Sequence, residues 1–406
     1  MLFDACRIRH RHAPTDDHRA EPLARVLVRV RFPADRRGAG PLYLISCHRN
    51  VPHRVRASPL HGGKAPRYLF ERMVPLSREI VIFLAREFGR EEVLRRLSDP
   101  YWFQAFGCVL GFDWHSSGLT TTVCGALKEG LRGTENDLGI FVAGGKGATS
   151  RRTPVEITTA CEGIGRDPEP LVYASRISAK VDNSAIQDGY QLYHHSFVFT
   201  AKGQWCIVQQ GMSDATSMAR RYHWLSDNVS SYVSEPHAAI CCDATAPTLN
   251  LVAKESAEAR SASATLAAEK PEATLEALRH LPLLDMPRRH QVARIDIDPK
   301  YLKKILLRTY EKAPADFESL LAIEGVGAKT LRALALTSEL IYGTRASHRD
   351  PARYSFAHGG KDGTPYPVDR STYDKTIEVM HHALNGAKID RSEKLKAFRR
   401  LAEFAG

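Results

Sequence analysis

Long apolar runs are missing from this 406-residue sequence, and none approaches the roughly 20 residues that a membrane-spanning helix requires. A continuous apolar signal core is also missing near the N-terminus, because Arg25, Arg29 and Arg31 interrupt the apolar residues there. These absences exclude a membrane-spanning protein and a secretory leader. They predict a cytoplasmic protein with no membrane partner.

Cys-x-x-Cys pairs are absent, although the chain has eight cysteines. Most of these cysteines have apolar neighbours, as at residues 108–110 and 205–207. Scattered cysteines in apolar company are typical of buried free thiols in a reducing compartment. The cysteines therefore predict neither a disulfide framework nor a redox motif.

Lysine is absent from the first 56 residues, which contain twelve Arg and five acids and so carry a net charge of +7. The whole chain carries +11, so only +4 remains for the other 350 residues. The basic balance is therefore a property of one Arg-rich segment. With Pro and Gly breaks and one strand-like run at residues 26–32, residues 1–57 are predicted to be a poorly ordered extension, the alternative being a nucleic-acid-binding arm.

Two catalytic signatures are also lacking. Residues 144–147 read Gly-Gly-Lys-Gly without the Lys-Ser/Thr order of a P-loop, so they predict a flexible basic loop, either a plain surface loop or one that contacts phosphate. Residues 208–211 read Val-Gln-Gln-Gly, so they offer amides where a nuclease core of the restriction-enzyme type has an acid-x-Lys signature.

The residues that are present predict an α+β fold. With 43% hydrophobic and 25% charged residues, the chain has the composition of a globular protein with room for two or three domains. Apolar residues recur at helical spacing within 76–97, and residues 192–200 and 204–211 flank a turn as a β-hairpin does. Ser213 and Asp214 then predict the start of a helix that runs to Trp224.

The predicted domain order has four parts. The Arg-rich extension, residues 1–57, is followed by a mixed α/β domain, residues 58–253, which contains the hairpin and the candidate catalytic residues. Residues 254–274 are rich in Ala, Ser and Glu and predict a linker or a solvent-facing helix. Residues 275–406 are predicted to form an all-helical domain.

The best-defined candidate site lies within residues 320–342, where two apolar helical segments flank a turn with two glycines. Glycines allow a tight turn, and the amides at the start of the second helix attract a phosphate. The predicted phosphate-binding residues are Gly325, Val326, Gly327, Ala328, Lys329 and Thr330. The pattern Gly-Val-Gly-Ala-Lys-Thr resembles the helix-hairpin-helix family of DNA-binding elements, which hold the nucleic-acid backbone without reading bases. A protein-docking hairpin is the alternative.

Some members of that family are base-excision glycosylases that also cut abasic sites, and their Schiff-base lysine follows the second hairpin glycine. Lys329 occupies the corresponding place, and the surroundings of Asp369 resemble those of their catalytic aspartate. The sequence departs from their pattern because these two residues are 40 positions apart, about twice the family's separation, and because Glu324 replaces the usual proline. The resemblance implies a glycosylase-lyase with Lys329 as nucleophile as an alternative function.

A dense polar segment at residues 180–237 predicts a metal-dependent phosphodiesterase. A Mg²⁺ or Mn²⁺ ion neutralises a scissile phosphate and acidifies its bound water, and it prefers carboxylate ligands. The predicted metal ligands are Asp182, Asp188 and Glu235, with His195 or His237 as ligand or general acid/base and Lys180 steadying the phosphate. His194 and His195 must face opposite sides of a strand. The alternative is a hydrogen-bonded structural network.

Several motifs together resemble a prokaryotic domain-of-unknown-function family found in bacteria and archaea. They are Asp-Trp-His-Ser-Ser-Gly at 113–118, Gln-Asp-Gly-Tyr-Gln-Leu-Tyr at 187–193, Arg-Tyr-His-Trp at 221–224 and Ser-Phe-Ala-His-Gly-Gly-Lys-Asp-Gly at 355–363. The resemblance covers about residues 58–402 and implies that the hairpin element and the preceding domain belong together. The sequence thus predicts a DNA-processing, repair-type protein that binds DNA or RNA, with a non-catalytic nucleic-acid-binding protein as a further alternative.

Overall fold

The computed structural model describes residues 26–29, 44–47, 65–112, 118–279, 299–354, 360–361, 364–365 and 370–405. The chain divides into two compact units, residues 1–56 and residues 57–406. In the first unit, β1 (Val26–Arg29) pairs antiparallel with β2 (Leu44–Cys47). The predicted strand at 26–32 is thus observed in its first four residues, and the poor order predicted for 1–57 falls mostly on residues outside the described ones. No helix among the described residues is long and apolar enough to cross a membrane.

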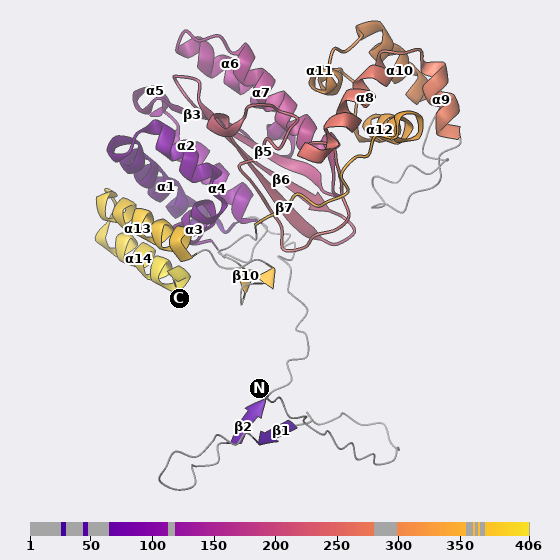
Figure 1. Ribbon diagram of the computed structural model, residues 1–406. Helices are drawn as coiled ribbons and strands as arrows, with labels where there is room; N and C mark the ends of the chain where they lie inside the picture. Colours follow the sequence, from indigo (N-terminus) through magenta and orange to yellow (C-terminus); the bar gives the residue numbers. More distant parts are fainter. Residues whose placement is uncertain are drawn as a thin grey trace. The chain divides into compact units, whose positions relative to one another are not determined.

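The second unit is built on a five-stranded antiparallel sheet of order β3-β5-β6-β7-β8 (Figure 1). Its strands are β3 (Ile140–Lys146), β5 (Gln191–Thr200), β6 (Trp205–Ser213), β7 (Met218–Leu225) and β8 (Ala239–Cys241). The predicted hairpin at 192–211 is confirmed, because β5 and β6 pair with His195 opposite Gln209 and Phe197 opposite Ile207. The predicted α+β class is likewise confirmed by this sheet and by the helices at the C-terminus.

The helix predicted at 213–224 is wrong, because Ser213 ends β6, residues 214–217 form a turn and residues 218–224 lie in β7. The stretch Arg-Arg-Tyr-His-Trp-Leu alternates between two buried faces, as a central strand does. Tyr222 and Trp224 belong to one core, whereas Leu225 belongs to the other. Pairing with β6 satisfies the backbone that a helix would otherwise have satisfied internally.

One face of the sheet is covered by helices from both ends of the unit (Figure 1). The helices are α1 (Arg67–Glu87), α2 (Arg90–Ser98), α3 (Pro100–Leu110), α4 (Leu119–Leu131), α13 (Arg370–Gly386) and α14 (Arg391–Ala405). All eleven residues of α3 are buried, and Asp99 caps its N-terminus by accepting from the amides of Tyr101 and Trp102. This core includes Val198 and Val208 from the sheet.

The opposite face carries the second core, to which Phe197, Ile207 and Trp224 contribute from the sheet. Its helices are α6 (Thr153–Gly163), α7 (Glu169–Lys180), α8 (Ala257–Ala267), α9 (Pro271–Arg279), α10 (Pro299–Lys312), α11 (Phe317–Ala322) and α12 (Ala328–Tyr342). The short elements are α5 (Glu135–Leu138), β4 (Ile186–Gln187), β9 (Leu249–Asn250), β10 (Gly360–Lys361), β11 (Thr364–Pro365), the 3₁₀ turns Gly147–Arg152, Ser226–Asn228 and Lys254–Ser256, and a π-helical turn Val181–Ala185.

Two features differ from the predicted domain order. Residues 254–274 are not a solvent-facing linker, because α8 buries Ala259, Ser263 and Leu266 and packs against α12. Residues 275–406 do not share one core, since α10–α12 pack on one face of the sheet and α13–α14 on the other. The predicted flexible loop at 144–147 is also different, because Gly144 and Gly145 lie in β3 opposite Ser196 and His195.

Candidate functional site

Asp182 is the centre of a buried polar cluster on the α7 face of the sheet. It follows α7 in the π-helical turn and is fully buried. Its carboxylate accepts hydrogen bonds from Gln209 Nε2 at 2.5 Å, Trp224 Nε1 at 2.9 Å and His237 Nε2 at 2.5 Å. Three donors thus compensate the removal of this charge from water.

The cluster extends from Asp182 to α7 through His195. Gln209 Nε2 donates to Asp182, so its Oε1 faces His195 Nδ1 at 2.8 Å, and His195 Nε2 lies 2.9 Å from Ser175 Oγ. The amide oxygen is only an acceptor, so Nδ1 of His195 carries the hydrogen and Nε2 accepts from the serine hydroxyl. Burial lowers the pKa of His195, which favours this neutral form.

His194 faces the other core, as the alternation of a strand requires. Its pairing partner on β6 is Gln210, next to Val208 of that core. Burial lowers the pKa of His194 to about 3, so the ring is neutral at physiological pH. The two histidines thus face opposite sides of β5, as predicted, and only His195 of the two contacts the Asp182 cluster.

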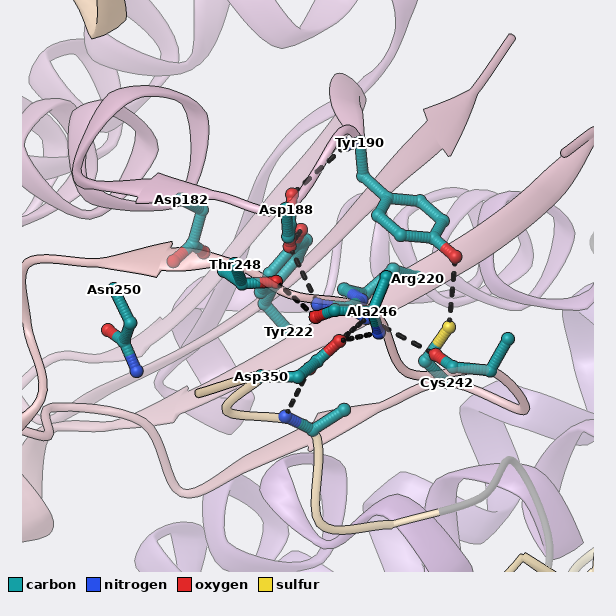
Figure 2. Close-up of polar contacts among 12 residues, drawn as sticks. Asp182, Asp188, Tyr190, Arg220, Tyr222, Cys242, Ala246, Thr248, Asn250 and Asp350 are labelled. Atoms are coloured by element: carbon teal, nitrogen blue, oxygen red, sulfur yellow. Dashed lines mark hydrogen bonds and ion pairs between the residues drawn. The ribbon is translucent and has the colours of Figure 1, made fainter. Parts of the chain in front are cut away.

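Asp188 belongs to a separate cluster, which Figure 2 shows around Arg220. Its Oδ2 accepts from Arg220 Nη1 at 2.9 Å and from the Tyr222 hydroxyl at 2.6 Å. Arg220 also donates to Asp350 Oδ2 at 2.8 Å and stacks over the Tyr190 ring. Burial raises the pKa of Asp188, against the opposing effect of Arg220. This is a buried charge network in which Asp188 and Asp350 pair with Arg220, although Arg220 Nε has no hydrogen-bond partner among the described residues.

The predicted divalent-metal site does not fit these contacts. The carboxylates of Asp182 and Asp188 are each engaged by N–H or O–H donors, and Asp182 lies to one side of the Asp188 cluster in Figure 2. Glu235 is half-exposed, with Oε1 3.7 Å from Arg353 Nη2. Across the described residues, no three His, Cys, Asp or Glu side chains are grouped to hold an ion. Of the predicted catalytic and metal residues, only Asp182, His195 and His237 are brought together.

Lys180 has a different position from the predicted one beside a scissile phosphate. It is the last residue of α7, and its ammonium donates to the carbonyl oxygens of Leu321 and Ile323, each at 2.6 Å, with the oxygen of Val326 at 3.5 Å. Burial lowers the pKa of Lys180 to about 8. Lys180 therefore contacts the turn between α11 and α12, not the acidic cluster.

That turn has a conformation that depends on its glycines. Gly325 has φ +87°, in the left-handed region, and a Cβ there would lie 2.6 Å from Ile305 Cδ1. Gly327 is extended and precedes α12, while the side chain of Val326 is buried between them in the core. The two predicted helices around a glycine turn are thus observed.

The first turn of α12 leaves main-chain donors without acceptors. Leu331 N donates to Gly327 O, but no hydrogen bond among the described residues uses the amides of Gly327 or Ala328. Lys329 is exposed, whereas Thr330 is buried, so the hydroxyl of Thr330 is not placed for the predicted phosphate contact. The amides are the orphan donors expected at a helix N-terminus.

Arg332 is a buried cation beneath this turn that the sequence prediction missed. Its Nε donates to Gln187 Oε1 at 2.7 Å, and Gln187 Nε2 donates to Ala328 O at 2.8 Å. Arg332 is 2% exposed, and its Nη1 and Nη2 atoms have no hydrogen-bond partner within the described part of the chain. Burial lowers the pKa of Arg332 to about 10, so it remains charged at neutral pH. The available signal was an arginine inside the apolar stretch Leu-Arg-Ala-Leu.

Comparison with known proteins identifies one family. The DUF763 family, described as a protein of unknown function, matches residues 54–368. No curated protein and no solved structure matches the chain. The match spans most of the second compact unit, including the sheet, both buried polar clusters and the α11–α12 turn. The chain therefore belongs to the DUF763 family.

Proposed function

We propose that this protein binds the sugar-phosphate backbone of DNA or RNA through α11, the turn at 323–327 and the first turn of α12, as a helix-hairpin-helix element. The observation that carries the proposal is the pair of amides at Gly327 and Ala328, which have no acceptor among the described residues and lie at the start of a 15-residue helix. Such amides and the positive end of the helix dipole favour a phosphate. Exposed Lys329 adds a charge beside them.

Two cations, partly buried Lys180 and buried Arg332, strengthen the positive potential behind the turn. Lys180 and Arg332 form no ion pair with a carboxylate among the described residues, although the charge of Glu324 on the turn opposes that of Lys180 in part. Charges in a low-dielectric interior are screened less by salt than surface charges. The turn is thus suited to an anionic chain.

The proposal covers binding and no reaction. Asp182, Asp188 and Lys180 are occupied by protein contacts, and Asp369, the predicted partner of Lys329 in a glycosylase-lyase, lies outside the described residues. Within the described part of the chain, none of these contacts therefore favours the predicted nuclease and lyase activities.

The test is fluorescence anisotropy of labelled duplex DNA, single-stranded DNA and RNA over a range of salt concentrations. Ala328→Pro removes one amide at the first helical position, where proline is tolerated. We expect it to weaken binding about tenfold or more, the effect of losing one hydrogen bond to a charged group. Lys329→Ala should lower the slope of log affinity against log salt by about 1.

Lys304→Ala is the matched control, since Lys304 is exposed on the neighbouring α10 and should affect binding little. Absence of salt-sensitive binding to all three nucleic acids would overturn the proposal. Equal affinity of the wild type and Ala328→Pro would show that this turn is not the binding site.

A further inference from the structure

We propose that Lys180 positions the α11–α12 turn for binding a nucleic-acid backbone, because its ammonium holds the carbonyl oxygens of the turn. This inference rests on the proposed function, because the consequence for affinity requires that the turn bind phosphate. The geometry itself does not depend on any ligand. Lys180 is a positioning residue, since it contacts the turn's carbonyls and not the anion.

The contacts of Lys180 match an ammonium to three main-chain oxygens. An ammonium has three N–H donors, and the carbonyl oxygens of Leu321, Ile323 and Val326 converge on it. These carbonyls belong to the end of α11 and the turn, where the backbone is rich in acceptors. Ile323 O also accepts from Val326 N, so the same oxygen closes the turn and binds the cation.

Peptide geometry links these carbonyls to the amides on the other side of the turn. In a planar trans peptide, the C=O and the N–H point in opposite directions. The contact between Lys180 and Val326 O therefore directs the N–H of Gly327 away from Lys180. Gly327 lacks a Cβ and has wide conformational freedom, so its peptide plane needs such a restraint.

The backbone that carries Lys180 is itself anchored to the sheet. Asp182, two residues later, is held by Gln209 and Trp224. Gln187, at the end of the same segment, donates to Ala328 O and so ties the start of α12. The buried cluster, which was predicted to be catalytic, thereby supports two attachments to the turn.

The test compares Lys180→Met, which keeps most of the side-chain length and removes the charge, with Lys128→Met as a matched control. Lys128, in α4, is also partly buried and donates to a main-chain carbonyl, Gly144 O at 2.9 Å. This carbonyl belongs to β3 and not to the α11–α12 turn. Two quantities are measured. The first is the dissociation constant for duplex DNA, and the second is the hydrogen-exchange rate of peptides covering residues 323–331, determined by mass spectrometry.

For Lys180→Met we expect affinity to fall about tenfold and exchange at 323–331 to accelerate, with exchange in the sheet unchanged. Lys128→Met should leave both readouts at the turn unchanged. Lys180→Ala removes the propylammonium part of the side chain, so added propylammonium should partly restore affinity. Tetramethylammonium at equal ionic strength, which has no N–H donor, should not.

Unchanged exchange and affinity in Lys180→Met would overturn the proposal. If Lys180→Met fails to fold, Lys180→Gln is used instead, because it keeps N–H donors without the charge. Unchanged exchange and affinity in Lys180→Gln would also overturn the proposal. If the wild type binds no nucleic acid, the proposed function fails, whereas the exchange readout still decides whether Lys180 orders the turn.

Discussion

At the residue scale, Lys180 is a partly buried charge in contact with main-chain oxygens. Its protonation should therefore affect the affinity for nucleic acid. Burial lowers the pKa of Lys180 to about 8, while Glu324 nearby raises it. Below that pH the ammonium is formed and the turn is fully charged. A neutral amine has two N–H donors for three carbonyl oxygens and no charge.

We therefore expect nucleic-acid affinity to fall as pH rises from 7 to 9.5. Stability should change in the opposite direction, because the folded pKa of Lys180 lies below the ordinary lysine value of 10.5, so the unfolded chain binds more protons between these values. The Lys180 contribution to stability thus rises with pH above about 8. Anisotropy and urea denaturation over this range measure the two trends. Parallel loss of stability and affinity would contradict this account.

Asp182 provides a second prediction at this scale. Asp182→Ala removes the acceptor of Gln209, Trp224 and His237 and leaves three buried donors unsatisfied. We expect a loss of about 3 kcal/mol or more in the free energy of unfolding, measured by urea denaturation. Asp227→Ala, at an exposed pair with Arg95, should cost less than about 1 kcal/mol.

Thermal unfolding with added Mg²⁺ or Mn²⁺ tests the predicted metal-ligand role of Asp182. Mg²⁺ or Mn²⁺ should not raise the melting temperature of the wild type. A rise that disappears in Asp182→Asn would instead show that the carboxylate binds the ion.

At the scale of elements, β3 packs closely against β5 and α6 at Gly144. Gly144 has φ +88°, and a Cβ there would lie 2.2 Å from His195 O and 2.6 Å from Thr153 Oγ1. Its amide donates to Glu156 Oε2 at 2.7 Å and its carbonyl accepts from Lys128. The glycine therefore allows β3, β5 and α6 to approach closely.

Gly144→Ala should destabilise the protein by about 3 kcal/mol or more, because both backbone strain and a clash with main chain arise. Gly163→Ala, at the end of α6 with open space around it, is the matched control and should change stability by less than about 1 kcal/mol. Thermal unfolding of both variants measures the difference. A mild effect of Gly144→Ala would show that β3 can shift.

At the scale of the whole molecule, both hydrophobic cores lie in the second compact unit. A chain of residues 57–406 should therefore unfold cooperatively and retain binding that is sensitive to Ala328→Pro. Residues 1–56 carry net charge +7, so their removal should lower affinity mainly at low salt, where long-range attraction is least screened. Loss of folding in this truncated chain, measured by circular dichroism, would contradict the independence of the second unit.

Features that depend on neighbouring residues were predicted correctly from the sequence, whereas features that depend on contacts between distant residues were not. The β5–β6 hairpin and the helices around Gly325 were predicted because turn residues and apolar periodicity are local signals. Residues 218–224 were misassigned to a helix because Ser213 and Asp214 resemble a cap, whereas pairing with β6 decided the strand. The predicted metal ligands Asp182, Asp188 and Glu235 were not brought together for a related reason: each side chain has different partners.

The sequence by itself determined the α+β class, the glycine turn and the buried free thiols, which are observed at Cys108, Cys124, Cys161, Cys206, Cys241 and Cys242. Only the tertiary structure decided which polar groups meet. Lys180 contacts a carbonyl 141 residues away, and Arg332 contacts Gln187 across 145 residues. The physical reason is that a buried polar group must find a partner wherever the packing of the sheet and helices places one, and sequence spacing does not specify that place.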